Sequence, residues 1–269
     1  MEKKVKGKLM IIGGAEDKKG ECIILKKLFE LAGGQDANIV IMTVASEYPE
    51  KIGDEYTQIF KRFGAGSINA IHIRSRQDAN HSGLVEQIEK ASCIFFTGGD
   101  QLRITSLLGG TQAEEMLGKA YSRGIVIAGT SAGASVMSET MITSGNDDDA
   151  PKKCTLKMAP GLGLLKDVVI DQHFAQRGRI GRLLTAIAQN PHMLGLGIDE
   201  DTAVIIDSDA VFEIIGSHAV TIIDGKNLDF TNVSELKPDE ILSITNVNMH
   251  VLSSGYAFDI NLRKPLIGR

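Results

Sequence analysis

A serine stands among small residues directly after an apolar run, near the middle of the chain. The run 125–128 leads into Gly129-Thr130-Ser131-Ala132-Gly133, which fits the pattern G-x-S-x-G. A nucleophilic serine on a sharp strand-to-helix turn needs small neighbours, because its side chain must project from a strained corner. The pattern therefore predicts that Ser131 is a nucleophile. The alternative is a tight corner in a packed α/β core.

A nucleophilic serine needs a base, and His173 is the histidine whose surroundings suit that role. It follows the apolar run 168–170, so it is expected at the end of a strand, at the same sheet edge as Ser131. A dense polar cluster at such a place is hard to explain by packing. Its members are Asp171 and Gln172 before the histidine, and Arg177, Arg179 and Arg182 after it. The other histidines have ordinary positions in predicted strands, turns or a helix start: His72, His81, His192, His218 and His250.

An orienting acid is expected at a further strand end, where it would hold the tautomer of the base. The stretch "GLGIDEDTAVII" offers Asp199, Glu200 and Asp201 between two apolar runs. The residues themselves leave the choice among the three open, and the alternative is an acidic turn. The chain order serine, histidine, acid argues against an α/β-hydrolase, in which the acid precedes the histidine.

Alternating apolar and amphipathic segments must position these residues. Continuous apolar strands predict a mostly parallel central sheet with helices on both faces, an α/β fold in one domain over 1–269. After about Asp199, short strands separated by turns predict antiparallel strands at the sheet edge. The expected strands lie within 8–14, 37–46, 68–75, 92–101 and 125–129, and the expected helices within 21–34, 54–66, 81–91 (capped by Ser82) and 111–124.

The loops that follow the strands are where a parallel α/β sheet binds ligands. The glycine turns at 13–16, 98–101 and 129–133 match neither a dinucleotide fingerprint nor a P-loop, so nucleotide binding has no support. We interpret 13–16 as a tight turn. The acidic stretch 144–153 is expected to be a solvated loop, with a lid or a metal site as the alternatives.

Composition excludes several classes of protein. A net charge of −5, with 23% charged residues, lacks the basic excess of a general nucleic-acid binder. Cys22, Cys93 and Cys154 are too few and too widely spaced for a disulfide framework or a zinc site. No apolar run has the length of a signal core or a membrane span. We predict a soluble, cytoplasmic protein that needs no metal or cofactor and has no nucleic-acid or membrane partner.

Four motifs in order, "FTGGDQ", "GTSAGAS", "DQHFAQRGRIGRL" and "GIDEDTA", resemble those of the cyanophycinases in the peptidase E group of serine peptidases. The similarity covers most of the chain, from "IIGGAED" onward, and the family's fold is similar to class I glutamine amidotransferases. The resemblance implies a triad of Ser131, His173 and Glu200, with an oxyanion hole from the N–H groups of Gly99 and Ala132. It also implies a homodimer that releases β-Asp-Arg dipeptides from cyanophycin, a poly-aspartate carrying arginine on each side-chain carboxyl.

That substrate offers carboxylates and guanidinium groups to the polar cluster. Arginines pair bidentately with carboxylates, so Arg177, Arg179 and Arg182 are candidate substrate ligands; their alternative is a solvated helix face. Asp171 is the candidate to bind the substrate guanidinium. Gln101 and Gln172 are the candidates to orient polar backbone groups of the substrate. Two rival functions stay open: a peptidase E-like enzyme acting on α-aspartyl peptides, and a non-catalytic binding protein on the same scaffold.

Overall fold

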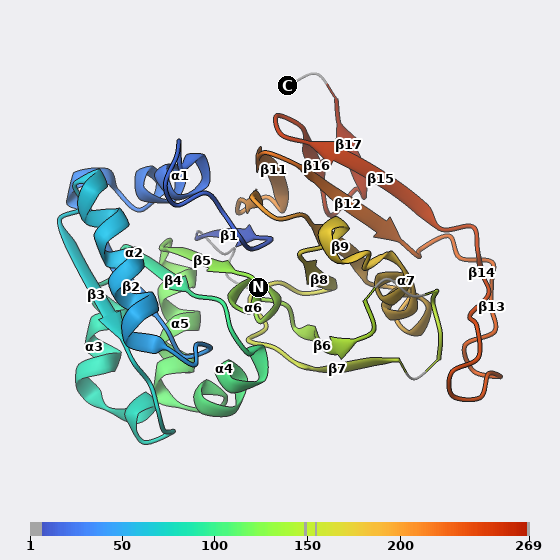
Figure 1. Ribbon diagram of the computed structural model, residues 1–269, viewed down its shortest axis with the longest axis horizontal. Coiled ribbons are helices and arrows are strands. Elements are labelled where there is room, and N and C mark those ends of the chain that lie inside the picture. The colour runs from blue at the N-terminus through green and yellow to red at the C-terminus, as the bar shows by residue number, and fades with distance from the viewer. Residues whose placement is uncertain (1–6, 148–149, 154, 268–269) are drawn as a thin grey trace.

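A nine-stranded sheet forms the centre of the computed structural model, which describes residues 7–147, 150–153 and 155–267 (Figure 1). Its strand order is β17-β16-β11-β10-β1-β5-β4-β2-β3, and the pairs from β1 to β3 are parallel. The pairs from β1 to β17 are antiparallel. The strands are β1 (Lys8–Ile12), β2 (Asn38–Met42), β3 (Ser67–Ile71), β4 (Cys93–Phe96), β5 (Val126–Thr130), β10 (Thr202–Ile206), β11 (Val211–Gly216), β16 (Ala257–Asp259) and β17 (Lys264–Leu266).

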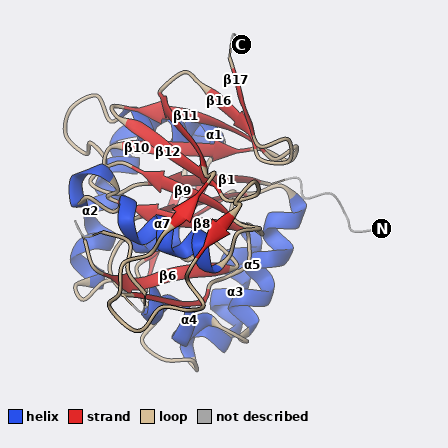
Figure 2. Ribbon diagram, turned by 90° about the vertical axis from the view of Figure 1, so that its right-hand side faces the viewer, coloured by secondary structure: helices blue, strands red, loops and turns tan. Residues whose placement is uncertain are grey.

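Helices cover both faces of this sheet, as the continuous apolar strands predicted (Figure 2). Alternate residues of β1 enter different cores: Leu9 packs with residues of α3, α4 and α5, and Met10 packs with residues of α1 and α2. The helices are α1 (Ile23–Leu31), α2 (Pro49–Phe63), α3 (Ser82–Lys90), α4 (Gln101–Leu108), α5 (Gln112–Arg123), α6 (Ala132–Ser135) and α7 (Ile180–Gln189), with short 3-10 turns at Gly34–Asp36, Asp78–Asn80 and Ala175–Arg177.

A second sheet packs against the face that carries α3, α4 and α5, with the strand order β15-β12-β9-β8. The expected antiparallel edge is therefore divided: β10 and β11 extend the central sheet, whereas β12 and β15 belong to the second one. The strand before His173, β8, also lies in the second sheet. The strands are β8 (Val168–Gln172), β9 (Leu194–Ile198), β12 (Ala219–Asp224) and β15 (Asn248–Ser253), and two small hairpins pair β6 (Thr140–Gly145) with β7 (Leu156–Pro160) and β13 (Phe230–Thr231) with β14 (Ile244–Thr245).

Local hydrogen bonds correct two expectations for the helices. The helix α4 was not predicted; it begins directly after the glycine turn because Asp100 Oδ1 accepts the Leu102 N–H at 2.8 Å and caps it. The cap of α3 is His81, whose Nδ1 accepts the Gly83 N–H at 3.2 Å, and Ser82 is already the first helical residue.

The described residues contain neither a helix suited to a membrane nor a cluster suited to a metal ion. None of their helices combines the length and the apolar character that crossing a bilayer requires. No group of three or more His, Cys, Asp or Glu side chains is placed there to hold a metal ion. Cys154 and part of the acidic stretch 144–153 lie outside the described residues.

Candidate active site

Ser131 occupies the corner between β5 and α6 with φ 54° and ψ −111°, a backbone conformation that non-glycine residues rarely adopt. The small neighbours are needed to build this corner. A Cβ on Gly129 would lie 2.2 Å from the Gly133 carbonyl oxygen, and a Cβ on Gly133 would lie 2.4 Å from that of Phe96. The chain therefore folds tightly enough to project the serine side chain from the strand end.

The Ser131 hydroxyl, the His173 imidazole and the Glu200 carboxylate form a continuous line of hydrogen bonds. Ser131 Oγ lies 2.9 Å from His173 Nε2, and His173 Nδ1 lies 2.7 Å from Glu200 Oε1. With the ring neutral, Nδ1–H donates to the carboxylate and Nε2 is left to accept the serine proton. The arrangement can therefore deprotonate a serine and stabilise the imidazolium that results.

The two neighbouring acids have other partners. Asp199 is buried and accepts backbone N–H groups from Ala175 (3.0 Å) and Ala219 (3.2 Å). Asp201 accepts the Asp17 N–H at 2.8 Å. Of the three acids that the sequence left open, only Glu200 bonds His173, because the turn directs the acids on either side of it away from the ring.

Burial lowers the pKa of His173 below its usual value of 6.5. The hydrogen bond and charge of Glu200 oppose this effect, and the positive charges of Arg177 and Arg179 reinforce it. The net direction keeps the imidazole neutral near pH 7, the protonation state that a general base requires.

The turn after β1 holds the backbones of all three site segments, although it contributes none of the three side chains. Three consecutive carbonyls, from the last residue of β1 into this turn, each accept one N–H from a different segment. The sequence indicated only a tight turn here; the structure adds this role in holding the site together. The bonds run from Ser131 N to Ile12 O (3.0 Å), from His173 N to Gly13 O (2.9 Å) and from Asp201 N to Gly14 O (2.9 Å).

The glycine turn after β4 passes beside the nucleophile. A Cβ on Gly98 would lie 3.4 Å from Ser131 Cβ, and Gly99 has φ 144° with the Ala45 carbonyl oxygen only 2.0 Å from where its Cβ would stand. Within the described residues, the backbone N–H groups of Gly99 and Ala132 have no backbone acceptor. Both N–H groups are therefore available for a ligand oxygen.

Asp171 and Arg182 pair with each other. Asp171 is fully buried, and its Oδ2 accepts Arg182 Nε at 2.7 Å while Oδ1 accepts Nη2 of the same guanidinium. The expectation that Asp171 receives a substrate guanidinium is corrected by this geometry, because the carboxylate is fully buried and its charge is already neutralised by Arg182.

Arg179 belongs to the same buried network. Its Nη1 donates to the Gln172 carbonyl at 2.6 Å and to the Gln172 side chain at 3.2 Å, and Asp147 accepts from Arg179 Nε (2.7 Å) and from Arg182 Nη1 (3.3 Å). Arg179 and Arg182 are only 5% and 7% exposed, so the alternative of a solvated helix face is wrong for both. Their first role is to support the strand that leads to His173.

Two candidate substrate ligands remain accessible. Arg177 is exposed, and its guanidinium has no hydrogen bond or ion pair among the described residues. Gln101 is half-buried and donates through Nε2 to the carbonyls of Ile142 (2.9 Å) and Thr143 (3.2 Å), which leaves its side-chain oxygen as an acceptor. Arg177 is therefore the cation of this cluster best placed to meet a substrate carboxylate.

A pocket of about 280 Å³ opens on Ser131 and His173. Sequence reasoning missed its most unusual residue, Glu16, which is only 4% exposed; the signal was its place directly after the first glycine turn.

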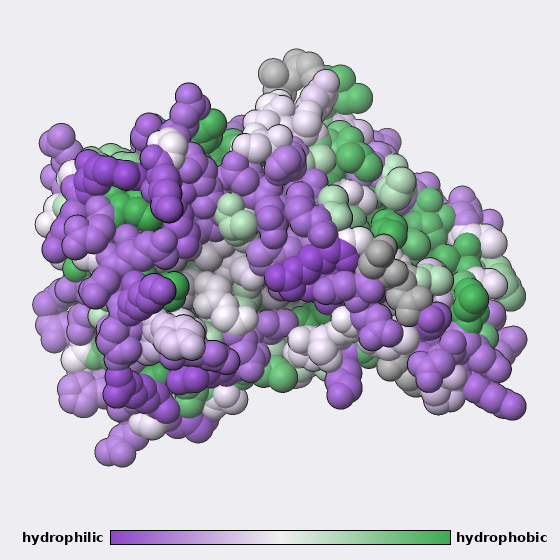
Figure 3. Space-filling model, viewed as in Figure 1, coloured by the Kyte–Doolittle hydropathy of each residue, from purple (hydrophilic) through white to green (hydrophobic). Residues whose placement is uncertain are grey.

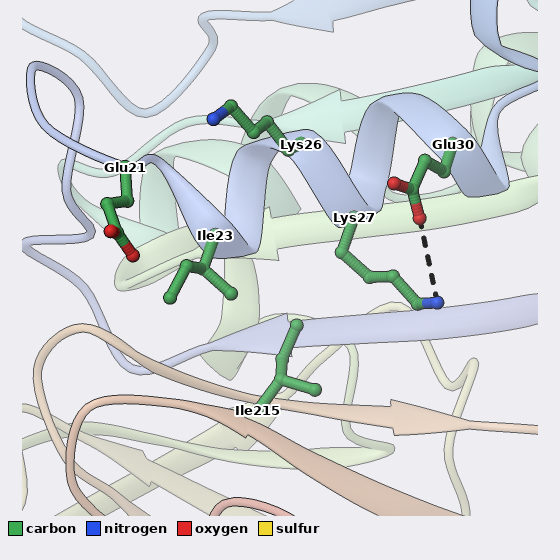
Figure 4. Close-up of a pocket in the computed structure, with 6 residues that line it drawn as sticks. All are labelled: Glu21, Ile23, Lys26, Lys27, Glu30 and Ile215. Carbon is green, nitrogen blue, oxygen red and sulfur yellow. Dashed lines mark ion pairs between the residues drawn. The ribbon is translucent and has the colours of Figure 1, made fainter.

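Hydrophilic side chains dominate the face of the molecule seen in Figure 3. A larger groove between α1 and β11, where Ile23 faces Ile215 beside the Lys27–Glu30 ion pair, shares no lining residue with this pocket (Figure 4).

Comparison with known proteins identifies a family and a set of relatives. Residues 9–214 match peptidase family S51. A cyanophycinase of Geminocystis herdmanii is 38% identical over the whole chain and 99% of its own length, and one of Nostoc sp. is 39% identical over 96% of the chain and 87% of its own length.

Two solved structures share the fold. A peptidase from an acI-B1 Actinobacterium superposes with a TM-score of 0.68 at 19% identity, covering 96% of this chain and 98% of that one. A putative peptidase E protein from Listeria monocytogenes reaches 0.52 at 16% identity, covering 78% and 98%.

Proposed function

The chain belongs to peptidase family S51, and we propose that Ser131, His173 and Glu200 are the catalytic triad of this serine peptidase. The observation that carries the proposal is the pair of bonds of 2.9 Å and 2.7 Å that joins the three side chains through one imidazole. The strained backbone of Ser131 supports the same assignment, since such strain persists where it serves a site.

The proposed chemistry is acyl transfer. His173 Nε2 takes the serine proton as Ser131 Oγ bonds to the substrate carbonyl carbon, and the N–H groups of Gly99 and Ala132 hold the oxyanion. His173 then gives that proton to the leaving amine as the C–N bond breaks. Water attacks the acyl-enzyme, its proton passes to His173 and on to Ser131 Oγ, and the acid product leaves. Glu200 stabilises the imidazolium during both the formation and the hydrolysis of the acyl-enzyme.

The proposed substrate is cyanophycin, which the enzyme hydrolyses to β-Asp-Arg dipeptides. Relatives 38% and 39% identical over nearly the whole chain are cyanophycinases, which supports this substrate. Arg177 is proposed to bind a substrate carboxylate, and the free oxygen of Gln101 a backbone N–H. Three buried residues are proposed to position His173 without contacting the substrate, by holding the segment that carries it: Arg179, Arg182 and Gln172.

Incubation with insoluble cyanophycin, followed by mass analysis of the soluble product, tests the function. We expect β-Asp-Arg, and none from Ser131→Ala. Undiminished release by that variant would remove Ser131 from the mechanism. Hydrolysis of α-aspartyl dipeptides without release from cyanophycin would favour a peptidase E-like enzyme. A fluorophosphonate that fails to label Ser131 would favour a non-catalytic binding protein.

We also propose a cytoplasmic homodimer. Support for the dimer comes from β15, a strand at the edge of the second sheet that exposes the apolar side chains of Met249 (59%) and Val251 (58%). An exposed apolar edge strand is suited to pairing with another chain. Sedimentation velocity should give a dimer for the wild type and a monomer for Val251→Lys; a wild-type monomer would reject it. Cell fractionation tests the compartment.

A further inference from the structure

A buried carboxylate stands beside the nucleophile without belonging to the triad. Glu16, on the turn after β1, is 4% exposed. Its Oε1 accepts the Tyr56 hydroxyl, and its Oε2 accepts the Thr130 hydroxyl at 2.6 Å. Burial, reinforced by the Glu16 charge, raises the pKa of Tyr56 far above its usual value, so the phenol stays a neutral donor. Neither hydroxyl brings a positive charge.

No cation neutralises Glu16 among the residues that the structure describes. Lys18, which lines the same pocket, pairs instead with Glu55 at 3.1 Å and lies with its Nζ 4.4 Å from the centre of the Tyr56 ring. A carboxylate taken out of water without a counter-charge is costly, and two neutral hydrogen bonds recover only part of that cost. A ligand that brought a positive charge would complete the environment.

The pocket presents this carboxylate to whatever binds at Ser131. Glu16 lines it together with Ser131, His173 and Gly98, so a substrate group in the pocket would extend from the reacting carbonyl. Each oxygen of Glu16 has one hydrogen-bond donor and can accept another. Tyr48, 66% exposed, also lines the pocket and offers an aromatic face.

We propose that this pocket is a subsite for a guanidinium group and that Glu16 is its specificity-determining residue. A planar guanidinium can donate two parallel N–H bonds to a carboxylate and stack on an aromatic ring, whereas an ammonium does neither as well. The inference rests on the proposed function in one respect, that the substrate carries arginine. The subsite identifies Glu16 as the residue that binds the arginine side chain, and it places that side chain in the pocket beside Ser131.

The first experiment compares two substrates on two enzymes. A short β-Asp-Arg oligomer is paired with its citrulline counterpart, which has the same shape without the charge. The wild type should prefer arginine in kcat/KM by roughly 10- to 100-fold, the range of a hydrogen bond to a charged group. Glu16→Gln should lose that preference through a fall on the arginine substrate alone.

A control variant separates recognition of the guanidinium by Glu16 from a purely structural role of Glu16. Tyr56→Phe removes one donor to Glu16 and keeps the charge, so it should retain the preference for arginine. An equal loss by Glu16→Gln on both substrates would overturn the proposal, since it would mean that Glu16 only supports Thr130. A preference that survives Glu16→Gln would overturn it too.

A second experiment needs no turnover and leaves Glu16 in place. Agmatine, an alkylguanidine, should slow fluorophosphonate labelling of Ser131, and the analogue that has a neutral urea in place of the guanidinium should not. Tyr48→Ala should weaken the protection, which locates it in this pocket. Equal effects of the two compounds would reject the subsite even if cyanophycin is cleaved. Protection by agmatine in an enzyme that fails to cleave cyanophycin would reject the proposed function and keep the subsite.

Discussion

The backbone of Gly14 lies directly against the imidazole of His173: a Cβ on Gly14 would stand 2.4 Å from Cε1 of the ring and 2.6 Å from Nε2. Nε2 is the atom that faces Ser131 Oγ, so the absence of a side chain at residue 14 sets where the base can stand. The same turn accepts backbone N–H groups from both the serine and the histidine segments. A turn that contributes no side chain to the proposed triad thus constrains its geometry.

Gly14→Ala should lower kcat/KM by about 100-fold or more, because a misplacement of catalytic groups on the order of 1 Å can cost that much. Gly64→Ala is the matched control: its φ of +91° is close to the +102° of Gly14, but nothing lies within 4 Å of its Cβ position. Gly64→Ala should lose only the stability that its positive φ costs and keep its activity, whereas Gly14→Ala should lose at least as much stability and also its activity, as thermal unfolding and steady-state rates would show. Equal activities would mean that the ring tolerates the methyl group.

Glu200→Gln should lower kcat by about four orders of magnitude, since an amide cannot hold the tautomer or stabilise the imidazolium as a carboxylate does. Asp201→Asn is the control, because its remaining oxygen can still accept the Asp17 N–H. Steady-state rates of both variants decide the matter. If Asp201→Asn were crippled and Glu200→Gln silent, the orienting acid would be Asp201.

The pH profile of kcat/KM should rise with pH through the pKa of His173, because only the neutral ring accepts the serine proton. Burial lowers that pKa, so the midpoint should lie below 6.5. Arg177→Ala removes a positive charge that lowers the pKa further, and its midpoint should move to higher pH. A wild-type midpoint above 6.5, or a shift to lower pH in Arg177→Ala, would contradict these electrostatics.

Arg182→Met should destabilise the protein by about 3–5 kcal/mol, because it leaves the fully buried Asp171 carboxylate without its bidentate partner. The double variant Arg182→Met with Asp171→Asn should recover part of the loss, since it removes the unpaired charge. Arg177→Ala, at an exposed position, should change stability by no more than about 0.5 kcal/mol. Urea unfolding measures all three. A harmless Arg182→Met would mean that the pair is not structural.

The sequence could predict much of the fold because local patterns carry it. Apolar runs buried on both faces identify β1, β2, β4 and β5 as strands, and amphipathic spacing identifies α1, α2, α3 and α5 as helices. It could not assign the C-terminal strands to their sheets, since β10 and β12 have the same apolar texture and differ only in which neighbours they meet. The helix α4 was missed although Asp100, a residue type that favours the N-cap position, stands directly before it.

By itself the sequence determined the chemistry available: Ser131 on a corner of small residues, His173 in a polar cluster, and three acids at a later strand end. The residues themselves left the choice among the acids open, because adjacent residues in a turn have the same sequence context but different directions in space, and the family resemblance implied Glu200. Only the tertiary structure directed Glu200 toward His173, paired Asp171 with Arg182, and brought the turn after β1 against all three segments. The pairing of β8 with β9 brings His173 and Glu200 together, and both reach Ser131 only once the second sheet packs against the central one.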